Sequence, residues 1–313
     1  MSNYFEPISF AQWSSQKSHF SKALMRSFQD TGFAVITDHG LDQDIISAAT
    51  ARSKDFFALP TDQKLAYYDK QHGGQRGYTP FGTENAKGQT SADLKEFWHT
   101  GRAGKRGNPY AAHMRTTPDV SEIDGFDTAT RALFASLDRF GQSILEAVAL
   151  GLDLAQTWFT PRVDEGNSIL RLLHYPAQTE APPPGSVRAH AHEDINVITL
   201  LLGAEEAGLE VLHRSGTWLA INPPKGALVV NVGDMLQRLT NGKLPSTTHR
   251  VVNPPEARKG VARYSMPFFL HFAPDVLIAP LESCIDDSKD VLPAITAHDY
   301  LMQRLQEIGL IKS

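Results

Sequence analysis

Residues 188–202 read RAHAHEDINVITLLL, a stretch in which three potential metal ligands precede a β-branched, apolar run. The run is short, which is typical of a buried strand. Side chains alternate on an extended strand, so His190, His192 and Asp194 are expected on one face. Neighbouring residues on that face lie about 6.6 Å apart, and the outer two about 13 Å. Because metal–ligand bonds are about 2 Å long, one ion is better held by two of these residues and a third from another strand.

Short strand-like runs continue on both sides of this stretch, split by Gly, Pro and Asn turn signals. They include SILRLLHYP, GLEVLH, TWLAINPP, GALVVNVGD, STTHRVVNPP and ARYSMPFFLHF. This density of short strands without intervening helices favours a β-sandwich or barrel over a Rossmann sheet. The sequence shows no Walker loop, Rossmann glycine fingerprint or nucleophile elbow that would support another enzyme class.

The first 160 residues show a different sequence pattern. Helical periodicity dominates this region, which contains one short strand. Phe20, Leu24 and Phe28 repeat every fourth residue, and Gly32 then predicts a helix end. FAVITDHG follows as a strand and turn. A longer helical stripe comprises Leu133, Leu137, Phe140, Ile144 and Val148.

The C-terminal end returns to helix, where Thr296 and Asp299 form a capping-box pattern. We therefore expect two regions. Residues 1–160 form a helix-rich region packed on the core, and residues 161–313 form the β domain with its C-terminal helix.

Composition restricts the classes of protein to which the chain belongs. Of 313 residues, 41% are hydrophobic and 21% charged, and the net charge is −5. This balance argues against a nucleic-acid or membrane-surface protein. The only cysteine is Cys284, so no disulfide framework or thiolate cluster is expected. With no signal-peptide pattern at the N-terminus, a cytoplasmic protein is expected; the oligomeric state is not readable.

A third metal ligand is available at His249, within LPSTTHRVV. It lies 249 − 194 = 55 residues beyond Asp194, which leaves room for several strands to return the chain to the same place. Two imidazoles and one carboxylate on one face leave three adjacent octahedral positions open, as in non-haem Fe(II) oxygenases. The alternative is that a His-x-Asp pair and a remote histidine occur together by chance.

Arg263 and Ser265, in ARYSMPFF, stand two apart on a further expected strand. A guanidinium and a hydroxyl on one strand face form a clamp for a carboxylate. The apolar run that follows predicts a buried position for Arg263. Upstream, Tyr175 in LRLLHYP supplies a phenol able to bind the same carboxylate.

The order of these motifs resembles that of the isopenicillin N synthase-like dioxygenases. The resemblance is carried by the His-Glu-Asp run at 192–194, His249 and the Arg-x-Ser pair at 263–265. It extends over nearly the whole chain, since DTGFAVITDHGL is similar to the family's opening segment and FFALPTDQK to the helix end after it. RGYTPFGTE, DLKEFWH, GLEVL and VNVGDMLQRLTNGKLPSTTHRVV then follow in the matching order.

The resemblance implies a double-stranded β-helix, or jelly-roll, core that is mainly β with flanking helices. It implies that His192, Asp194 and His249 bind Fe(II). His190 then becomes a structural or neighbouring histidine more than a ligand.

The resemblance also implies that Arg263 and Ser265 bind the distal carboxylate of 2-oxoglutarate and that Tyr175 contacts the same molecule. Here the sequence departs from the family's Asn-Tyr-Tyr-Pro run, because Leu173 replaces the asparagine and His174 the first tyrosine. The departure puts one polar contact to 2-oxoglutarate in question but leaves the iron site intact.

The implied enzyme uses O2 and couples the decarboxylation of 2-oxoglutarate to succinate with hydroxylation or another oxidation of a small-molecule substrate. The metal carries that chemistry, while the protein positions the groups and excludes water. Aromatic residues are candidates to line the substrate pocket, although they also fit an ordinary core: Tyr78, Phe81, Phe268 and Phe269.

Three alternatives stay open. An Fe(II) oxidase of the same family that does not use 2-oxoglutarate would use the Arg-x-Ser pair for a substrate carboxylate. A metallohydrolase would use His190-x-His192 as a metal pair at a strand end, and a jelly-roll binding module would have no catalytic role. Neither the primary substrate nor the outcome of the oxidation can be read from the sequence.

Overall fold

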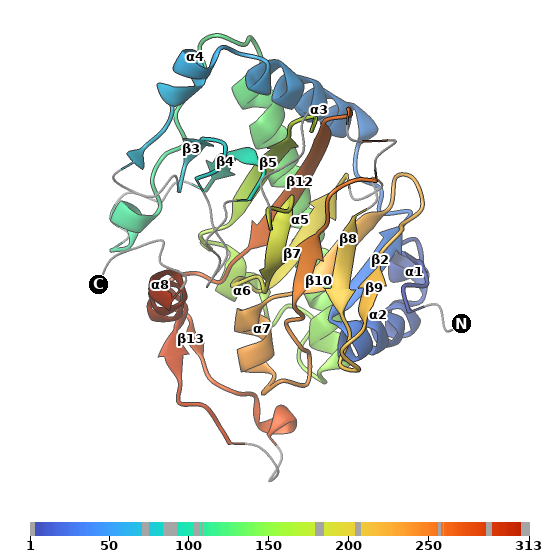
Figure 1. Ribbon diagram of the computed structural model, residues 1–313. Helices are drawn as coiled ribbons and strands as arrows, with labels where there is room; N and C mark the ends of the chain where they lie inside the picture. The colour runs from blue at the N-terminus through green and yellow to red at the C-terminus, as the bar shows by residue number, and fades with distance from the viewer. Residues whose placement is uncertain are drawn as a thin grey trace.

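The computed structural model describes residues 4–70, 75–83, 93–102, 107, 109–178, 185–203, 208–255, 258, 260–285 and 290–307. Within these residues the strands form an eight-stranded sheet, a four-stranded sheet and a small two-stranded sheet. Figure 1 shows the large sheet backed by helices on one side, with the shorter strands on the other. The fold is therefore mainly β with flanking helices around a jelly-roll core, as the sequence predicts.

The large sheet runs across strands from both ends of the chain, and only β1 and β2 are parallel among the pairs described. Its order is β1 (Ile8–Ser9), β2 (Phe33–Thr37), β10 (Leu228–Val232), β7 (Ile198–Leu202), β12 (Arg263–Leu270), β5 (Ile169–Tyr175), β4 (Glu96–Gly101) and β3 (Gly77–Thr79). The region up to residue 160 thus supplies four strands of this sheet as well as helices.

The small sheet is antiparallel and faces the large one. Its order is β6 (Ala189–His192), β11 (His249–Val251), β8 (Leu209–Leu212) and β9 (Trp218–Ala220). A further pair, β13 (Leu277–Ile278) and β14 (Ile295–Thr296), precedes the last helix.

The helices predicted around Phe20–Phe28, around Leu133–Val148 and at the C-terminal end are confirmed, whereas the short helices at 12–15, 61–65, 160–163 and 234–239 were not predicted. The described helices are α1 (Gln12–Ser15), α2 (Lys17–Thr31), α3 (Gln43–Phe57), α4 (Thr61–Leu65), α5 (Phe126–Gly151), α6 (Thr160–Val163), α7 (Asp234–Leu239) and α8 (Ala297–Glu307). Gly32 ends α2 with a positive φ of 74°, the left-handed conformation that glycine adopts without strain. Thr296 accepts from the backbone of Asp299 and donates to its side chain, which confirms the capping pattern before α8.

Both faces of the large sheet are largely covered, which explains why β2, β7 and β10 are almost continuous apolar runs. In β2, Ala34 and Ile36 join the core beneath the helices, whereas Phe33 and Val35 join the core between the two sheets. Consecutive residues therefore enter different cores. In the described part of the chain, no helix combines the length and apolarity that crossing a membrane requires.

Candidate metal centre

The three expected metal ligands come together where the two sheets meet. His192 ends β6 and His249 begins β11, and the two residues are direct cross-strand partners. Asp194 follows in the segment that carries the chain from the small sheet to β7 of the large sheet. One donor atom from each residue lies within 4.8 Å of the other two.

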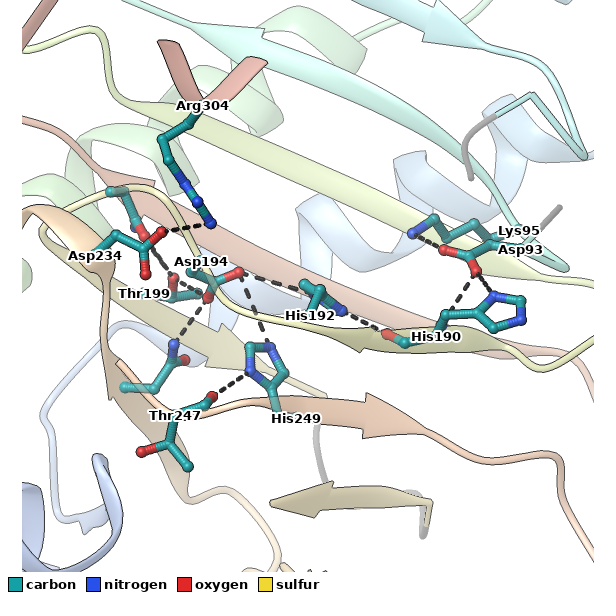
Figure 2. A network of polar contacts seen from close by, with 12 residues as sticks. Asp93, Lys95, His190, His192, Asp194, Thr199, Asp234, Thr247, His249 and Arg304 are labelled. Carbon is teal, nitrogen blue, oxygen red and sulfur yellow. Dashed lines mark hydrogen bonds and ion pairs between the residues drawn. The ribbon is translucent and has the colours of Figure 1, made fainter. Parts of the chain in front are cut away.

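Backbone carbonyl groups orient both imidazoles. The Nδ1 of His192 donates to the carbonyl of His190 at 2.6 Å, and the Nδ1 of His249 donates to that of Thr247 at 3.1 Å. Protons on Nδ1 leave each Nε2 with a lone pair in the neutral ring. Both Nε2 atoms lie 3.9 Å from Oδ1 of Asp194, and Figure 2 shows the three side chains pointing toward one another.

The carboxylate of Asp194 is held through its other oxygen. Oδ2 accepts from Thr199 at 2.6 Å and from Asn231 at 2.8 Å, which turns Oδ1 toward the imidazoles. Burial raises the pKa of this carboxyl, but the two histidines and these two hydrogen bonds outweigh burial and hold it below its ordinary value. The carboxyl group of Asp194 is therefore ionised at neutral pH, as metal binding requires.

The imidazole of His192 is neutral at the same pH. Burial of the ring, followed by the neighbouring His249, lowers the pKa of His192 to about 4. Metal ions bind the unprotonated nitrogen, so no proton has to be removed from this ligand near pH 7. Two imidazoles and one carboxylate match the donor set of a non-haem Fe(II) site, and donors 3.9 Å apart reach one ion after small side-chain rotations.

His190 does not join the ligand cluster, in agreement with the distance argument from the sequence. Its Nδ1 and its backbone N–H both bond Oδ1 of Asp93, at 2.5 and 3.1 Å. The other oxygen of Asp93 accepts from the buried Lys95 at 2.8 Å. Figure 2 shows this pair on the far side of His192 from Asp194. Asp93 thus fixes the residue whose carbonyl orients His192.

Arg263, Ser265 and Tyr175 also meet, on the large sheet. Arg263 is a cross-strand partner of Tyr175, its guanidinium carbon lies 5.1 Å from the centre of that ring, and Nη1 donates to Ser265 at 3.3 Å. Arg263 is 1% exposed. Among the described residues, its Nε has no hydrogen-bond partner and no carboxylate lies within 4.0 Å. A buried cation without a counter-ion calls for an anionic ligand.

The two departures from the family pattern lie on opposite faces of β5. Leu173 is buried beside Tyr175 and Phe97, on the face that carries Ser265. His174 points the other way, where its Nδ1 bonds Glu96 at 2.7 Å and its ring stacks on Tyr264. Leu173 is therefore the departure that faces the Arg263 pocket.

The four aromatic candidates for the pocket differ in burial and in the residues that they contact. Tyr78 is buried and bonds Glu96, Phe81 is half exposed, and Phe268 packs on Phe134 of α5 beneath the helices. Phe269 lies on the inner face with Arg263 and Ser265, because it alternates with Phe268 along β12.

Sequence reasoning missed the residues that hold the ligands. Asn231 is a polar residue inside the apolar run ALVVNVG, and Thr199 interrupts NVITLLL in the same way. A buried strand tolerates a polar side chain only with a hydrogen-bond partner, so both positions carried a signal. Asp93 and Lys95 carried no such signal, because their segment is distant in sequence from the proposed metal ligands.

Comparison with known proteins identifies the family. Residues 166–272 match the model of the 2OG-Fe(II) oxygenase superfamily, and residues 6–120 match that of the N-terminal region of non-haem dioxygenases in morphine synthesis. The 2-oxoglutarate-Fe(II) type oxidoreductase hxnY of Emericella nidulans is 31% identical over 91% of this chain and 83% of its own length. The chain belongs to the 2OG-Fe(II) oxygenase superfamily.

Solved structures agree with this assignment. A 2OG-Fe(II) oxygenase family protein from Caulobacter crescentus is 51% identical, with a TM-score of 0.91 over 97% of this chain and 99% of that one. A full-length Neurospora crassa protein, solved in complex with alpha-KG and thymine, is 29% identical, with a TM-score of 0.84 over 96% of each chain. This oxygenase is an enzyme that uses Fe(II), 2-oxoglutarate and O2.

Proposed function

We propose that His192, Asp194 and His249 bind the catalytic Fe(II), and that Arg263 binds the distal carboxylate of 2-oxoglutarate. One observation carries this proposal: a buried guanidinium without a counter-ion among the described residues stands on one sheet, and two imidazoles and a carboxylate converge where that sheet meets the other. The donor set fits Fe(II) and the arginine fits a dicarboxylate.

Bound together, Fe(II) and 2-oxoglutarate supply an oxidant derived from O2 that attacks a C–H bond, with succinate and CO2 as co-products. The side chains of the protein hold the proposed ligands in position. Thr199 and Asn231 hold Asp194, and Ser265 lies against the guanidinium of Arg263. Asp194 and His249 are buried, which keeps bulk water from these two side chains.

The proposed primary substrate is a small molecule, and the proposed compartment is the cytoplasm. Support for a small substrate comes from the Neurospora crassa relative, which is solved with thymine bound. The single cysteine, Cys284, is buried without a disulfide, as is common in a reducing compartment.

Calorimetric titration with Fe(II) under anaerobic conditions tests the metal site. The wild type should bind one Fe(II), and His192→Ala and Asp194→Ala should abolish that binding together with O2-dependent succinate release. His19→Ala removes an exposed histidine of α2 and should change neither. Substantial turnover in either ligand variant would refute the assigned triad.

Titration of the Fe(II)-loaded protein with 2-oxoglutarate tests Arg263. We expect Arg263→Ala to weaken 2-oxoglutarate binding by roughly 2–5 kcal/mol, because the variant removes one partner of a buried charge pair. Arg162→Ala is the control, since Arg162 stacks on Trp158 in a different part of the molecule. Unchanged affinity in Arg263→Ala would favour the alternative in which the clamp holds a substrate carboxylate.

A further inference from the structure

A cavity lies beside the proposed metal centre, where the C-terminal helix α8 packs against α7. Its wall includes Leu301 of α8, Met235 of α7, His271 directly after β12 and Asn167 just before β5. The cavity has a volume of about 270 Å³, part of which is open to solvent. The backbone N–H of Met235 donates to two carbonyls of the residues that directly follow Asp194. One wall of the cavity is therefore attached to the segment that carries this proposed metal ligand.

Apolar side chains form much of the cavity wall. Besides the residues from α7 and α8, Met114 and Phe272 line it, and both are buried. His113 and His298 complete the lining on one side, with their ring centres 4.5 Å apart. Because His113 is exposed and His298 only partly buried, this side lies toward solvent. A ligand of the cavity therefore has a mainly apolar body and meets few polar groups in the buried part of the wall.

His271 is a buried polar residue of this wall that lacks a partner. It is 7% exposed, and its Nδ1 has no hydrogen-bond partner among the described residues. The lowered pKa of His271, about 4, leaves the ring neutral at pH 7 with one N–H donor. A buried polar group of this kind is destabilising unless water or a ligand provides a partner. His271 is therefore available to a polar atom of a molecule in the cavity.

Arg76 places a positive charge behind the same wall. It is 4% exposed, and among the described residues no carboxylate lies within 4.0 Å of its guanidinium. The guanidinium donates to three backbone carbonyls and, from Nη2 at 2.6 Å, to Oδ1 of Asn167. These acceptors satisfy its N–H groups but do not neutralise its charge. Because Oδ1 is engaged, Asn167 has only its NH2 group to offer a ligand, which is a donor.

We propose that this cavity is the subsite for the primary substrate and that it binds a carboxylate of that substrate, with the N–H of His271 as donor and the charge of Arg76 behind it. The inference rests on the proposed function, since it needs the iron at His192, Asp194 and His249. A carboxylate accepts from both donors of the wall and is stabilised by the nearby guanidinium. The apolar part of the wall then fits a small aliphatic body.

A matched pair of probes tests the subsite in the protein loaded with Fe(II) and saturating 2-oxoglutarate under anaerobic conditions. Isovalerate carries a carboxylate on a small apolar body, and isovaleramide has nearly the same shape without the charge. We expect calorimetry to show isovalerate binding at least about tenfold more tightly than isovaleramide. His271→Leu deletes the donor and keeps an apolar wall, so it should reduce this preference to about threefold or less.

His213→Leu is the matched control and should retain the preference of the wild type. His213 also has a buried ring nitrogen without a hydrogen-bond partner among the described residues, but it follows β8 and does not line the cavity. Failure of isovalerate to bind the wild type, equal binding of the two probes, or a full preference in His271→Leu would overturn the subsite. So would displacement of isovalerate by further 2-oxoglutarate, which would place the probe at Arg263.

Leu301→Trp is a second variant, because the larger side chain fills the cavity from α8. It should weaken the binding of both probes by about tenfold or more, since they compete with the indole for the same space. Gln303→Trp places the same side chain at an exposed position of α8 and should leave both affinities unchanged. Unchanged probe binding in Leu301→Trp would show that the probes bind elsewhere.

The same titrations separate the subsite from the proposed function. The affinity of His271→Leu for 2-oxoglutarate should stay within about threefold of the wild type, because His271 lies beyond the end of β12 at which Arg263 stands. If the subsite is wrong, Fe(II) and 2-oxoglutarate still bind. If the proposed function is wrong, they fail to bind before any probe is added.

Discussion

At the scale of single residues, the hydrogen bonds to Asp194 orient the carboxylate that we propose as a metal ligand. Thr199 and Asn231 both occupy Oδ2, and both are buried in strands of the large sheet. Groups that orient a metal ligand raise metal affinity by removing the need to order that ligand on binding. The orientation of Asp194 thus depends on Thr199, which is 5 positions away in the sequence, and on Asn231, which is 37 positions away.

Asn231→Leu removes one of these donors at similar volume. We expect the affinity for Fe(II) to fall by about 10–100-fold, because Oδ2 is left buried without this partner. Anaerobic calorimetry measures the effect. Asn253→Leu is the matched control, since Asn253 bonds Ser186 and Gln178 outside the ligand cluster. A similar loss in the control would attribute the effect to general destabilisation.

His271 predicts a pH dependence of stability. Burial, followed by the neighbouring Arg76, lowers the pKa of His271 to about 4, against 6.5 for an unperturbed histidine. Between these values the unfolded chain binds more protons than the folded one, so the free energy of unfolding falls as the pH falls through this window. The loss attributed to His271 reaches about 3 kcal/mol near pH 4.

Urea unfolding of the metal-free protein at pH 7 and about pH 4.5 measures this dependence. His271→Gln should show a smaller loss of unfolding free energy between the two pH values than the wild type, because the glutamine does not titrate. His192 has a similarly lowered pKa and titrates in both proteins, so the difference between them reports His271. An equal loss of unfolding free energy in the wild type and in His271→Gln would contradict the role assigned to His271.

At the scale of elements, the segment from β6 to β7 joins the two sheets and carries Asp194. Asp194 is tied by its carbonyl, which accepts from the backbone of Asp234 at 2.7 Å. Gly233 precedes α7 and packs against Asn196, leaving no room for a Cβ, which would lie 2.1 Å from the Asn196 carbonyl oxygen. The start of α7 therefore sets the path of the segment.

Gly233→Ala should displace Asn196 and with it Asp194, because the close contact is with backbone that cannot rotate away. We expect a loss of about 2 kcal/mol or more in unfolding free energy, and weaker Fe(II) binding. Denaturant unfolding and anaerobic calorimetry measure the two effects. Gly260→Ala is the control, since an added Cβ meets nothing within 4 Å there. A tolerated Gly233→Ala would show that this segment is not constrained by α7.

At the scale of the whole molecule, the proposed sites for Fe(II) and 2-oxoglutarate are each built from segments that are distant in the sequence. The proposed metal ligands come from β6, β11 and the segment before β7, and Arg263 comes from β12. A ligand that binds only the folded arrangement stabilises it by mass action. The folded protein should therefore respond to each ligand as a single cooperative unit.

We expect anaerobic Fe(II) at about 100 times its dissociation constant to raise the free energy of unfolding by about 2.7 kcal/mol. Addition of 2-oxoglutarate should stabilise the protein further, and mainly when Fe(II) is present, because in the proposed site 2-oxoglutarate would contact the metal as well as Arg263. Thermal unfolding with each ligand separately and together measures this. His192→Ala should lose the Fe(II) increment, and a full increment in that variant would contradict the assigned site.

Sequence by itself determined the family to which the chain belongs, its mainly β core and its longer helices. Periodicity predicted α2 and α5, the density of short strands predicted the mainly β core, and ligand spacing excluded a metal site made of His190, His192 and Asp194 together. These features depend on neighbours within a few residues or on the identity of a side chain. They are therefore local properties.

Tertiary structure decided which residues face the site. Phe268 and Phe269 look equivalent in the apolar run that ends β12, yet one packs beneath α5 and the other contacts Arg171. Both faces of the large sheet are buried, so composition does not reveal the orientation of a strand, and a shift of one residue would exchange the faces. Strand register also brings His249 to His192, and a segment distant in sequence brings Asp93 to His190. Such pairings are set by the packing of the whole chain, because the energies that select them come from contacts far apart in sequence.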